Sequence, residues 1–508
     1  MATKTKKPAA AAPLRPRLTC PHCWKHFPPG EILWVAEHPA LTGDDLLGSN
    51  EPRRFLPTRF DVDGLALDVK GVECHELACP KCHLLIPRAL VELDPVFIST
   101  LGAPGSGKSY FLASMIHQTQ DIALRHFQSN LADVDPIGND VVNDYLNKLF
   151  RNSQPGELVN LEKTEQTGRQ YSSVSIDGRE LWLPKPFVYS LQPLQLQDER
   201  LRRQLCRALC LYDNAGEHFM PGKGASQLAT QHLALSKVLL FLFDPLQHAK
   251  FRQACMGRAS DPQLGQHGKN NPQDQVMQEA ARRVKTLTGL AQHAKYSRPL
   301  VVVVTKYDVW SSLLSEKPVE MTDLLCKIPD RGVALDLKRL QQLSQRVRKL
   351  LFELAPDIVA AAEGFSDEVI YFPNSALGCS PEIVRLNGGK EALGIRPCNI
   401  RPMLSELPLL YAFHRAVPTL IPGVQRGAEN GPTVLESVAK TTPHPALKPG
   451  AVLANEMTRQ QKAMPPGAPP RNPAGTSTHF APSREVQLAE APATSHPKVE
   501  TYLKEAGP

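Results

Sequence analysis

Short apolar runs alternate with stretches of helical periodicity through the middle of the chain. Dense runs of β-branched and other large apolar residues predict six buried strands, at 96–101, 171–176, 207–212, 238–243, 300–304 and 368–372. Apolar residues at helical spacing predict helices between several of them, at 109–124, 226–235, 278–294 and 335–355. This alternation implies right-handed crossovers and an α/β fold with a doubly wound, mainly parallel sheet. In such a sheet, ligands gather at the carboxyl ends of the strands.

Composition separates this central region from both ends of the chain. Of the 508 residues, 42% are hydrophobic, which is enough for at least one large core. The 46 prolines are densest near the two ends, where large apolar residues are few. We therefore predict a disordered basic arm at 1–18, a cysteine-containing module at 19–93, an α/β domain at 94–422 and a disordered Pro- and Ala-rich tail at 423–508.

Charge and cysteine usage bear on the compartment. The formal net charge of +7 is modest for this length, and part of it lies in the N-terminal arm. No uninterrupted apolar stretch approaches the roughly 18–20 residues of a membrane span, and the N-terminus lacks the apolar core of a signal peptide. Four of the eleven cysteines form two C-x-x-C pairs, which suits a metal site in a reducing compartment better than a disulfide framework. We expect a cytoplasmic protein without a transmembrane segment.

The most specific motif follows the first predicted strand of the central region. Residues 102–109 read Gly-Ala-Pro-Gly-Ser-Gly-Lys-Ser, a complete Walker A sequence with a strand before it and a helix after it. Its glycines let backbone N–H groups face phosphate, Lys108 offers charge to the β- and γ-phosphates, and Ser109 is a magnesium ligand. We expect a nucleotide to contact Gly102, Pro104, Gly105, Ser106, Gly107, Lys108, Ser109 and Tyr110.

A second polar motif follows the strand predicted at 207–212. It reads Asp213-Asn-Ala-Gly-Glu217. An acidic residue at the end of a buried strand suits a carboxylate that holds nucleotide-bound magnesium, usually through water. Gly216 would then present its backbone N–H to a γ-phosphate.

Two more motifs follow strands and point to the base. Thr305-Lys-Tyr-Asp308 comes after the strand at 300–304. The Asp308 carboxylate can accept from N1–H and the 2-amino group of guanine, whereas adenine lacks that amino group and would leave the carboxylate poorly paired. The stem of Lys306 can lie along the base. After the strand at 368–372 comes Ser375-Ala-Leu377, in which the N–H of Ala376 would contact the guanine O6.

Taken in order, these four motifs resemble those of the P-loop GTPases of the translation-factor and Ras-like class. The resemblance covers about residues 94–416. It implies GTP or GDP, Mg²⁺, and a switch cycle in which loops ordered by the γ-phosphate relax after hydrolysis. A cysteine module followed by a long GTPase-like domain also resembles the bacterial double-GTPase families in its general layout.

Three positions depart from the pattern of that class. Thr305 stands where an Asn is usual. Glu217 stands where a water-orienting Gln is expected, and its charge near the γ-phosphate implies slow hydrolysis. The resemblance also implies a switch Thr that reaches magnesium, for which Thr164 and Thr167 are the candidates and Thr164 is preferred. On this basis Lys108, Glu217 and Thr164 are the expected catalytic residues.

The cysteine module carries two turns that each present two thiolates. Four such sulfurs suit zinc, and each turn resembles half of a zinc ribbon. The 55 residues between the two turns exceed the roughly 15–20 of a compact ribbon, so the module must carry an insertion. Cys74, His75, His22, His26 and His83 are nearby alternative ligands, and unpaired structural cysteines or a redox pair are alternative roles. The expected zinc ligands are Cys20, Cys23, Cys79 and Cys82.

The sequence thus favours a GTP-binding regulatory protein that hydrolyses GTP slowly. A nucleotide-dependent scaffold without significant turnover is the alternative that Glu217 favours, and an ATPase is a third that Asp308 disfavours. The cysteine module lacks interleaved aromatic and basic residues, which argues against nucleic acid as a partner. Protein partners are expected at the cysteine module, at the long insertions 126–160 and 245–296, or at the tail.

Overall fold

A computed structural model of the chain describes residues 15–161, 169–176, 178–214, 216–219, 230–265, 270–329, 332–385 and 391–425. All of them belong to one compact unit, Met1–Gln461. The predicted arm and tail fall almost wholly outside these residues, and their disorder stays a prediction.

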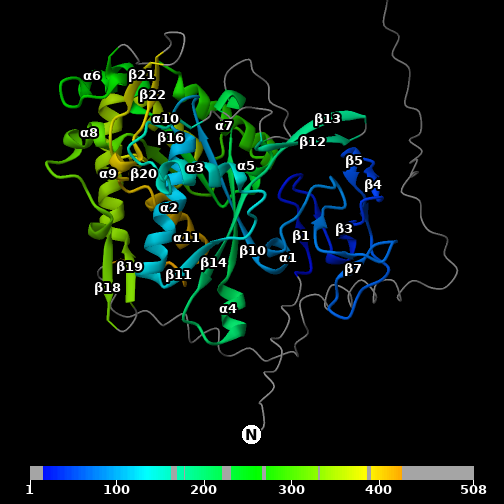
Figure 1. Cartoon of the computed structure of the whole chain (residues 1–508). Coiled ribbons are helices and arrows are strands. Elements are labelled where there is room, and N and C mark those ends of the chain that lie inside the picture. Colours follow the sequence, from blue (N-terminus) through cyan, green and yellow to red (C-terminus); the bar gives the residue numbers. More distant parts are fainter. Residues whose placement is uncertain are drawn as a thin grey trace, which may run out of the picture. The chain divides into compact units, whose positions relative to one another are not determined.

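Seven strands form a central sheet in the order β11-β14-β15-β10-β16-β17-β20. Figure 1 labels β10, β11, β14, β16 and β20 of this sheet. All neighbours from β15 to β20 are parallel, and β14 runs against both β11 and β15. The expected α/β fold with a mainly parallel sheet is therefore confirmed. The strands are β10 (Asp94–Gly102), β11 (Ser129–Asp133), β14 (Phe187–Pro193), β15 (Arg207–Asp213), β16 (Val238–Phe243), β17 (Leu300–Val304) and β20 (Val369–Pro373).

One predicted strand lies outside this sheet, and two strands of the sheet were not predicted. β12 (Tyr171–Ile176) pairs with β13 (Arg179–Pro184) as an antiparallel hairpin, so its assignment to the buried sheet is wrong. The serines of β12 are half-buried or exposed, whereas a strand covered on both faces needs a nearly continuous apolar run. β14 has such a run, and β11 is a short edge strand.

Helices join the strands of the sheet. α2 begins at Lys108 and α9 at Leu337, close to the predicted starts, while α7 ends at Thr288 because Gly289 adopts a left-handed φ of 68°. Of the helix predicted at 226–235, only α5 is described. The helices are α1 (Ala89–Glu92), α2 (Lys108–Phe127), α3 (Asp140–Phe150), α4 (Glu199–Leu205), α5 (His232–Leu235), α6 (Ala249–Cys255), α7 (Gln273–Thr288), α8 (Tyr307–Leu314), α9 (Leu337–Leu354), α10 (Pro356–Phe365) and α11 (Leu407–Ala416). None of the helices in the described part of the chain combines the length and apolar character that a membrane crossing needs.

Small sheets make up the remainder. One of three strands contains β18 (Leu325–Ile328), β19 (Gly332–Asp336) and β23 (Gly423–Val424), and β21 (Glu382–Arg385) pairs with β22 (Glu391–Gly394). The cysteine module contains β1 (Leu18–Thr19), β2 (His26–Phe27), β3 (Leu33–Val35), β4 (Thr42–Asp44), β5 (Gly48–Pro52), β6 (Arg54–Phe55), β7 (Ala66–Leu67), β8 (Glu73–Cys74) and β9 (Leu77–Ala78).

Strand β15 contacts a different neighbour on each of its faces. Leu209 and Leu211 belong to the large core that includes the apolar residues of α2. Ala208, Cys210 and Tyr212 belong to a second cluster, together with the buried cysteines and apolar side chains of the cysteine module. The hairpin β12–β13 also reaches this module, since Ser175 N donates to Leu46 O at 2.8 Å (Figure 1). The module therefore packs directly on one face of the sheet.

Candidate functional site

The carboxyl end of β10 is where the connections of the sheet change direction. From β10 the chain goes on to β14 and β15 on one side, and then crosses to β16, β17 and β20 on the other. Such a switch point opens a crevice between the loops that leave neighbouring strands, and open α/β sheets bind their ligands there. The Walker A residues 102–109 occupy this position.

The backbone of the Walker A loop turns through three glycines with positive φ. Gly102, Gly105 and Gly107 have φ values of 156°, 72° and 86°, which other residues rarely adopt. A Cβ on Gly102 would lie 2.9 Å from the backbone oxygen of Leu242, so this position also needs glycine for space. Lys108 is buried, and its Nζ donates to the oxygens of Gly102 and Ala103, each at 3.0 Å. The ammonium group is thereby held over the loop.

The hydroxyl groups of Ser106 in the loop and Tyr110 in α2 differ in their hydrogen bonding. The buried Oγ of Ser106 has no hydrogen-bond partner among the described residues, so it can bond to an added ligand. The hydroxyl of Tyr110 instead donates to Asn160 Oδ1 at 3.0 Å and accepts from Leu161 N at 3.1 Å. Tyr110 thus anchors the segment that precedes 162–168. Ser109 lies in the first turn of α2.

Gly216 lies beside this loop, and Asp213 ends the neighbouring strand β15. Asp213 is buried at the end of β15, opposite Thr100 of β10, whose Oγ1 is 3.5 Å from Asp213 Oδ1. Gly216 packs so closely that a Cβ there would lie 2.6 Å from Pro104 N and 2.8 Å from Gly102 O. The Gly216 backbone is therefore in contact with the loop, where only a glycine fits.

The expected base-recognition residues lie together at the ends of β17 and β20. Burial raises the pKa of the Asp308 carboxyl, and a hydrogen bond from Ser375 opposes that shift. The two loops are also joined through their backbones, because Tyr307 N donates to Asn374 O at 3.0 Å. Donors on a ligand that bonded to Asp308 would stabilise its charged form.

The neighbours of that pair have other contacts. Thr305 Oγ1 donates to Phe243 O at 3.2 Å. Lys306 has a left-handed φ of 58°, and its Nζ donates to Asp244 Oδ2 at 2.6 Å and to Gln263 Oε1 at 2.7 Å. Ser114 of α2 donates to the Ala376 oxygen, and the Leu377 oxygen accepts from Arg401 N at 2.7 Å. The Ser114 bond ties residues 375–377, which follow β20, to α2, the helix that follows the Walker A loop.

Sequence reasoning missed the side chains that hold Pro104. Gln247 Nε2 and Asn271 Nδ2 lie 3.4 and 3.1 Å from the Pro104 oxygen, and the two side chains bond to each other. Both come from the long segment after β16. The Asp244-Pro245 pair at the end of that strand was the available signal, since it is one more polar motif at a strand's carboxyl end.

Some expected residues lie outside the description. Thr164 and Thr167 fall in 162–168, which the structure does not describe. Glu217 lies in the short 3-10 turn Gly216–Phe219, where only its backbone is described. Their roles stay predictions.

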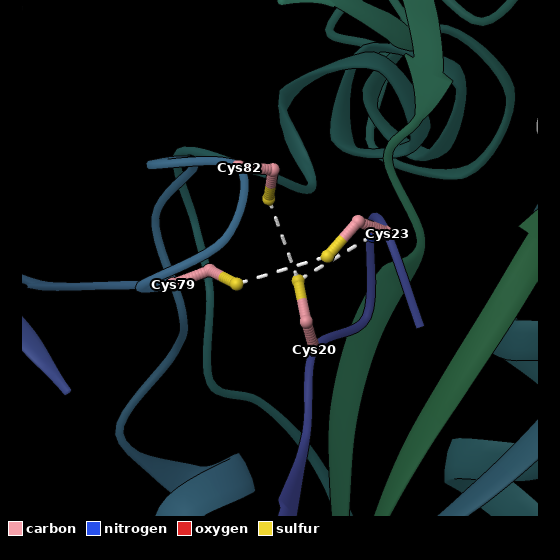
Figure 2. A group of neighbouring side chains, drawn as sticks. All are labelled: Cys20, Cys23, Cys79 and Cys82. Carbon is pink, nitrogen blue, oxygen red and sulfur yellow. Dashed lines mark hydrogen bonds between the residues drawn. The ribbon is translucent and has the colours of Figure 1, made fainter. Parts of the chain in front are cut away.

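The two C-x-x-C turns bring their four sulfurs to one point (Figure 2). The Sγ atoms of Cys20, Cys23, Cys79 and Cys82 all lie within 4.8 Å of one another, and all four residues are buried. Two of the separations, Cys20 to Cys82 and Cys23 to Cys79, are 3.7 Å. Sulfurs about 2.3 Å from a tetrahedral zinc ion are about 3.8 Å apart. The quartet therefore fits zinc in size and donor type.

Backbone donors around the quartet favour thiolates. The Cys20 sulfur accepts from the N–H groups of His22 and Cys23 at 3.3 and 3.4 Å, and the Cys79 sulfur accepts from Lys81 N at 3.3 Å. Burial raises the pKa of the Cys20 thiol, whereas hydrogen bonds from the neighbouring thiols lower the pKa of Cys23. A dication would offset the burial that disfavours charge on Cys20.

The alternative ligands are engaged elsewhere. The ring nitrogens of His22 face the oxygens of Leu85 and Pro184 at 3.0 and 3.3 Å. His26 bonds to Thr19, and His83 to Asp44. Cys74 donates to Val72 O, and His75 is exposed. All eleven cysteines are free thiols. The four cysteines of the two turns are thus the ligand set that the geometry selects.

Comparisons with known proteins do not identify a family for this chain. No protein-family model matches the chain, and no curated protein matches it. Among solved structures, the chain is similar to sup35 complexed with GDP, with 15% identity over 56% of this chain and a TM-score of 0.20. The alignment spans 38% of the sup35 chain. A TM-score of this size does not establish a common fold.

Proposed function

We propose that this protein binds a guanine nucleotide with Mg²⁺ and acts as a regulatory switch of the P-loop GTPase type. The observation that carries the proposal is the gathering of four motifs at one edge of the sheet. The Walker A loop contacts Gly216 on one side. On the other side, α2 donates a hydrogen bond to the Ala376 oxygen in the loop after β20. The doubly wound domain at 94–422 is then the nucleotide-binding unit.

The phosphate end of the site depends on backbone donors. The positive φ values of the loop glycines would let backbone N–H groups face the phosphates, and the start of α2 would add the positive end of its dipole. Lys108 would exchange its two loop carbonyls for phosphate oxygens, a stronger charge-assisted contact. Ser109, Asp213 and Thr164 are the proposed Mg²⁺ ligands, and the ion would neutralise charge on the β- and γ-phosphates.

The base end depends on Asp308. The half-buried Asp308 carboxylate accepts from Ser375 and from its own backbone N–H, and guanine would offer it two further, adjacent donors. The N–H of Ala376 is the proposed partner of O6. Lys306 bonds to Asp244 and Gln263. Its proposed role is therefore to brace the loop after β17, with the stem of its side chain beside the base.

The four cysteines are proposed as a structural zinc site in the module 19–93. A closed set of four thiolates leaves no open coordination position, so the metal would supply folding free energy rather than catalysis. Free thiols throughout the chain suit a reducing compartment such as the cytoplasm. Protein partners at the module, the insertions or the tail complete the proposal.

The proposal includes two possibilities for the hydrolysis of bound GTP. Glu217 follows Gly216 directly, and a carboxylate near a γ-phosphate would slow attack by water. A slow switch and a scaffold that does not hydrolyse GTP both bind nucleotide in this way. Single-turnover assays separate them, because a scaffold keeps its GTP intact with and without partners.

The binding proposal is tested by titrating labelled GTP and ATP against the wild-type chain and Lys108→Ala. We expect GTP to bind at least tenfold more tightly than ATP, because adenine cannot satisfy Asp308. Lys108→Ala should weaken GTP binding by at least about 100-fold and leave the zinc content unchanged, since it removes a charge-assisted contact. Tighter ATP binding, or full GTP affinity in the variant, would refute the proposal.

A further inference from the structure

We infer that the cysteine module positions Asp213 and Asn214, so that metal at the four cysteines and nucleotide at the Walker A loop stabilise each other. The inference rests on the proposed function and adds regulation to the same site. It follows from buried contacts that run from the first cysteine turn through Tyr212 to Asn214 and to β10, the strand that leads into the Walker A loop.

The first contact joins the cysteine turn to β15. Trp24 follows Cys23 directly, and its Nε1 donates to the Tyr212 hydroxyl at 3.2 Å. The same hydroxyl donates to the oxygen of Pro21, inside the turn, at 2.6 Å. All three groups are buried. The position of the turn therefore determines whether the Tyr212 hydroxyl has its partners, and a buried hydroxyl without partners costs about 1–3 kcal/mol.

The second contact joins Tyr212 to the segment that follows it. The Tyr212 ring stacks on His232 with centroids 4.4 Å apart and planes inclined by 12°. His232 Nε2 lies 3.0 Å from Asn214 Oδ1, and Asn214 Nδ2 donates to Thr100 O at 2.8 Å. Because Asn214 Oδ1 accepts, Nε2 carries a proton, and Nδ1 lies 2.6 Å from Ser99 Oγ. These two bonds hold the His232 ring in one orientation.

The third contact reaches the phosphate loop. Asn214 is 1% exposed and tied to both β10 and α5, two residues before Gly216. Gly216 lies against the backbone of Pro104 and Gly102. Side chains alternate along a strand, so Tyr212 faces the module while Asp213 faces the nucleotide side. The adjacent residues Tyr212 and Asp213 therefore connect the cysteine module to the proposed nucleotide site.

Backbone strain at Trp24 supports a role for its side chain. Trp24 and His83 each follow the second cysteine of a C-x-x-C turn, and their φ values are 56° and 61°. Glycine adopts this conformation freely, whereas a bulky residue is strained in it. Each side chain makes a specific contact that glycine would lack, Trp24 with Tyr212 and His83 with Asp44. Only the Trp24 contact leaves the module.

Reciprocity makes the inference measurable. If the metal raises GTP affinity by some factor, GTP must raise metal affinity by the same factor. We expect GTP to protect zinc from a chelating dye at equilibrium, with a zinc affinity about fivefold or more higher in the full-length wild-type chain. Trp24→Phe keeps an aromatic ring and removes the donor to Tyr212, so it should abolish that protection and weaken GTP binding by about three- to tenfold.

Trp34→Phe is the matched control. Trp34 is buried in the same module and packs edge-on against Phe60, and its Nε1 has no partner among the described residues. We expect this variant to keep wild-type GTP affinity and wild-type protection of zinc. Tyr212→Phe combined with Trp24→Phe should be no worse than Tyr212→Phe alone, because Tyr212→Phe already removes the hydrogen bond from Trp24 as well as the one to Pro21 O.

The outcomes separate the inference from the proposed function. A wild-type chain that binds no GTP overturns both. Tight GTP binding together with GTP-independent zinc affinity overturns the coupling alone, as do equal losses of GTP affinity in Trp24→Phe and Trp34→Phe. Selective loss in Trp24→Phe, at a thermal midpoint equal to that of Trp34→Phe, supports the coupling.

Discussion

The two faces of β15 are built from the same seven-residue strand and yet are covered in different ways. Leu209 and Leu211 pack into the large apolar core. Ala208, Cys210 and Tyr212 pack against the cysteine module, and Tyr212 is hydrogen-bonded to it. An aliphatic face gains stability from packed area, whereas a hydrogen-bonded face depends on the exact position of its partners. The face with Leu209 and Leu211 therefore stabilises the sheet. The face with Tyr212 is suited to transmitting a change in the position of the cysteine module.

The largest expected effect is on the module face. Cys79→Ser removes one of four sulfur ligands, and structural zinc sites of this kind contribute about 10 kcal/mol or more of apparent binding free energy. We expect the variant to be purified with little zinc and to be destabilised by at least about 3 kcal/mol.

Cys74→Ser is its control, because Cys74 is equally buried in the module but lies outside the quartet. It should keep one zinc per chain by metal analysis. Equal zinc contents in the two variants would mean that the quartet is not the metal site.

A smaller effect separates the two faces directly. Leu211 and Cys210 are adjacent and both 0% exposed, one on each face. Leu211→Ala should lower the free energy of unfolding by about 2–5 kcal/mol, since it leaves a cavity in the core. Cys210→Ala removes one sulfur atom and should lower it by about 1 kcal/mol. Chemical unfolding midpoints measure both, and the reverse ranking would contradict the division of roles between the faces.

The alternation of strands and helices was readable from the sequence because β15, β16 and β17 are continuous apolar runs covered on both faces. The polar motifs were readable because each directly follows such a run. β12 was misassigned because its length and end residues suit a strand of any kind, and periodicity alone does not say which sheet a strand joins.

Other features required coordinates. The choice among four cysteines and several nearby histidines depended on where the histidines find partners, as His83 does with Asp44. Nothing in the sequence places Trp24 beside Tyr212, because the contact joins residues 188 positions apart. From the sequence, Tyr212 was interpreted as one more apolar strand position. Its hydroxyl links the cysteine module to the central sheet only through tertiary packing.

The most direct measurement of guanine recognition is the base preference of Asp308→Asn. Xanthine presents N1–H as a donor and O2 as an acceptor, which an amide satisfies, whereas guanine presents two donors, which the carboxylate satisfies. We expect the variant to lose about 1.5–3 kcal/mol of GTP binding, roughly 10- to 150-fold, and to bind xanthosine triphosphate more tightly than GTP. Unchanged GTP affinity in the variant, with no gain for xanthosine triphosphate, would contradict the assignment of a guanine nucleotide to this site.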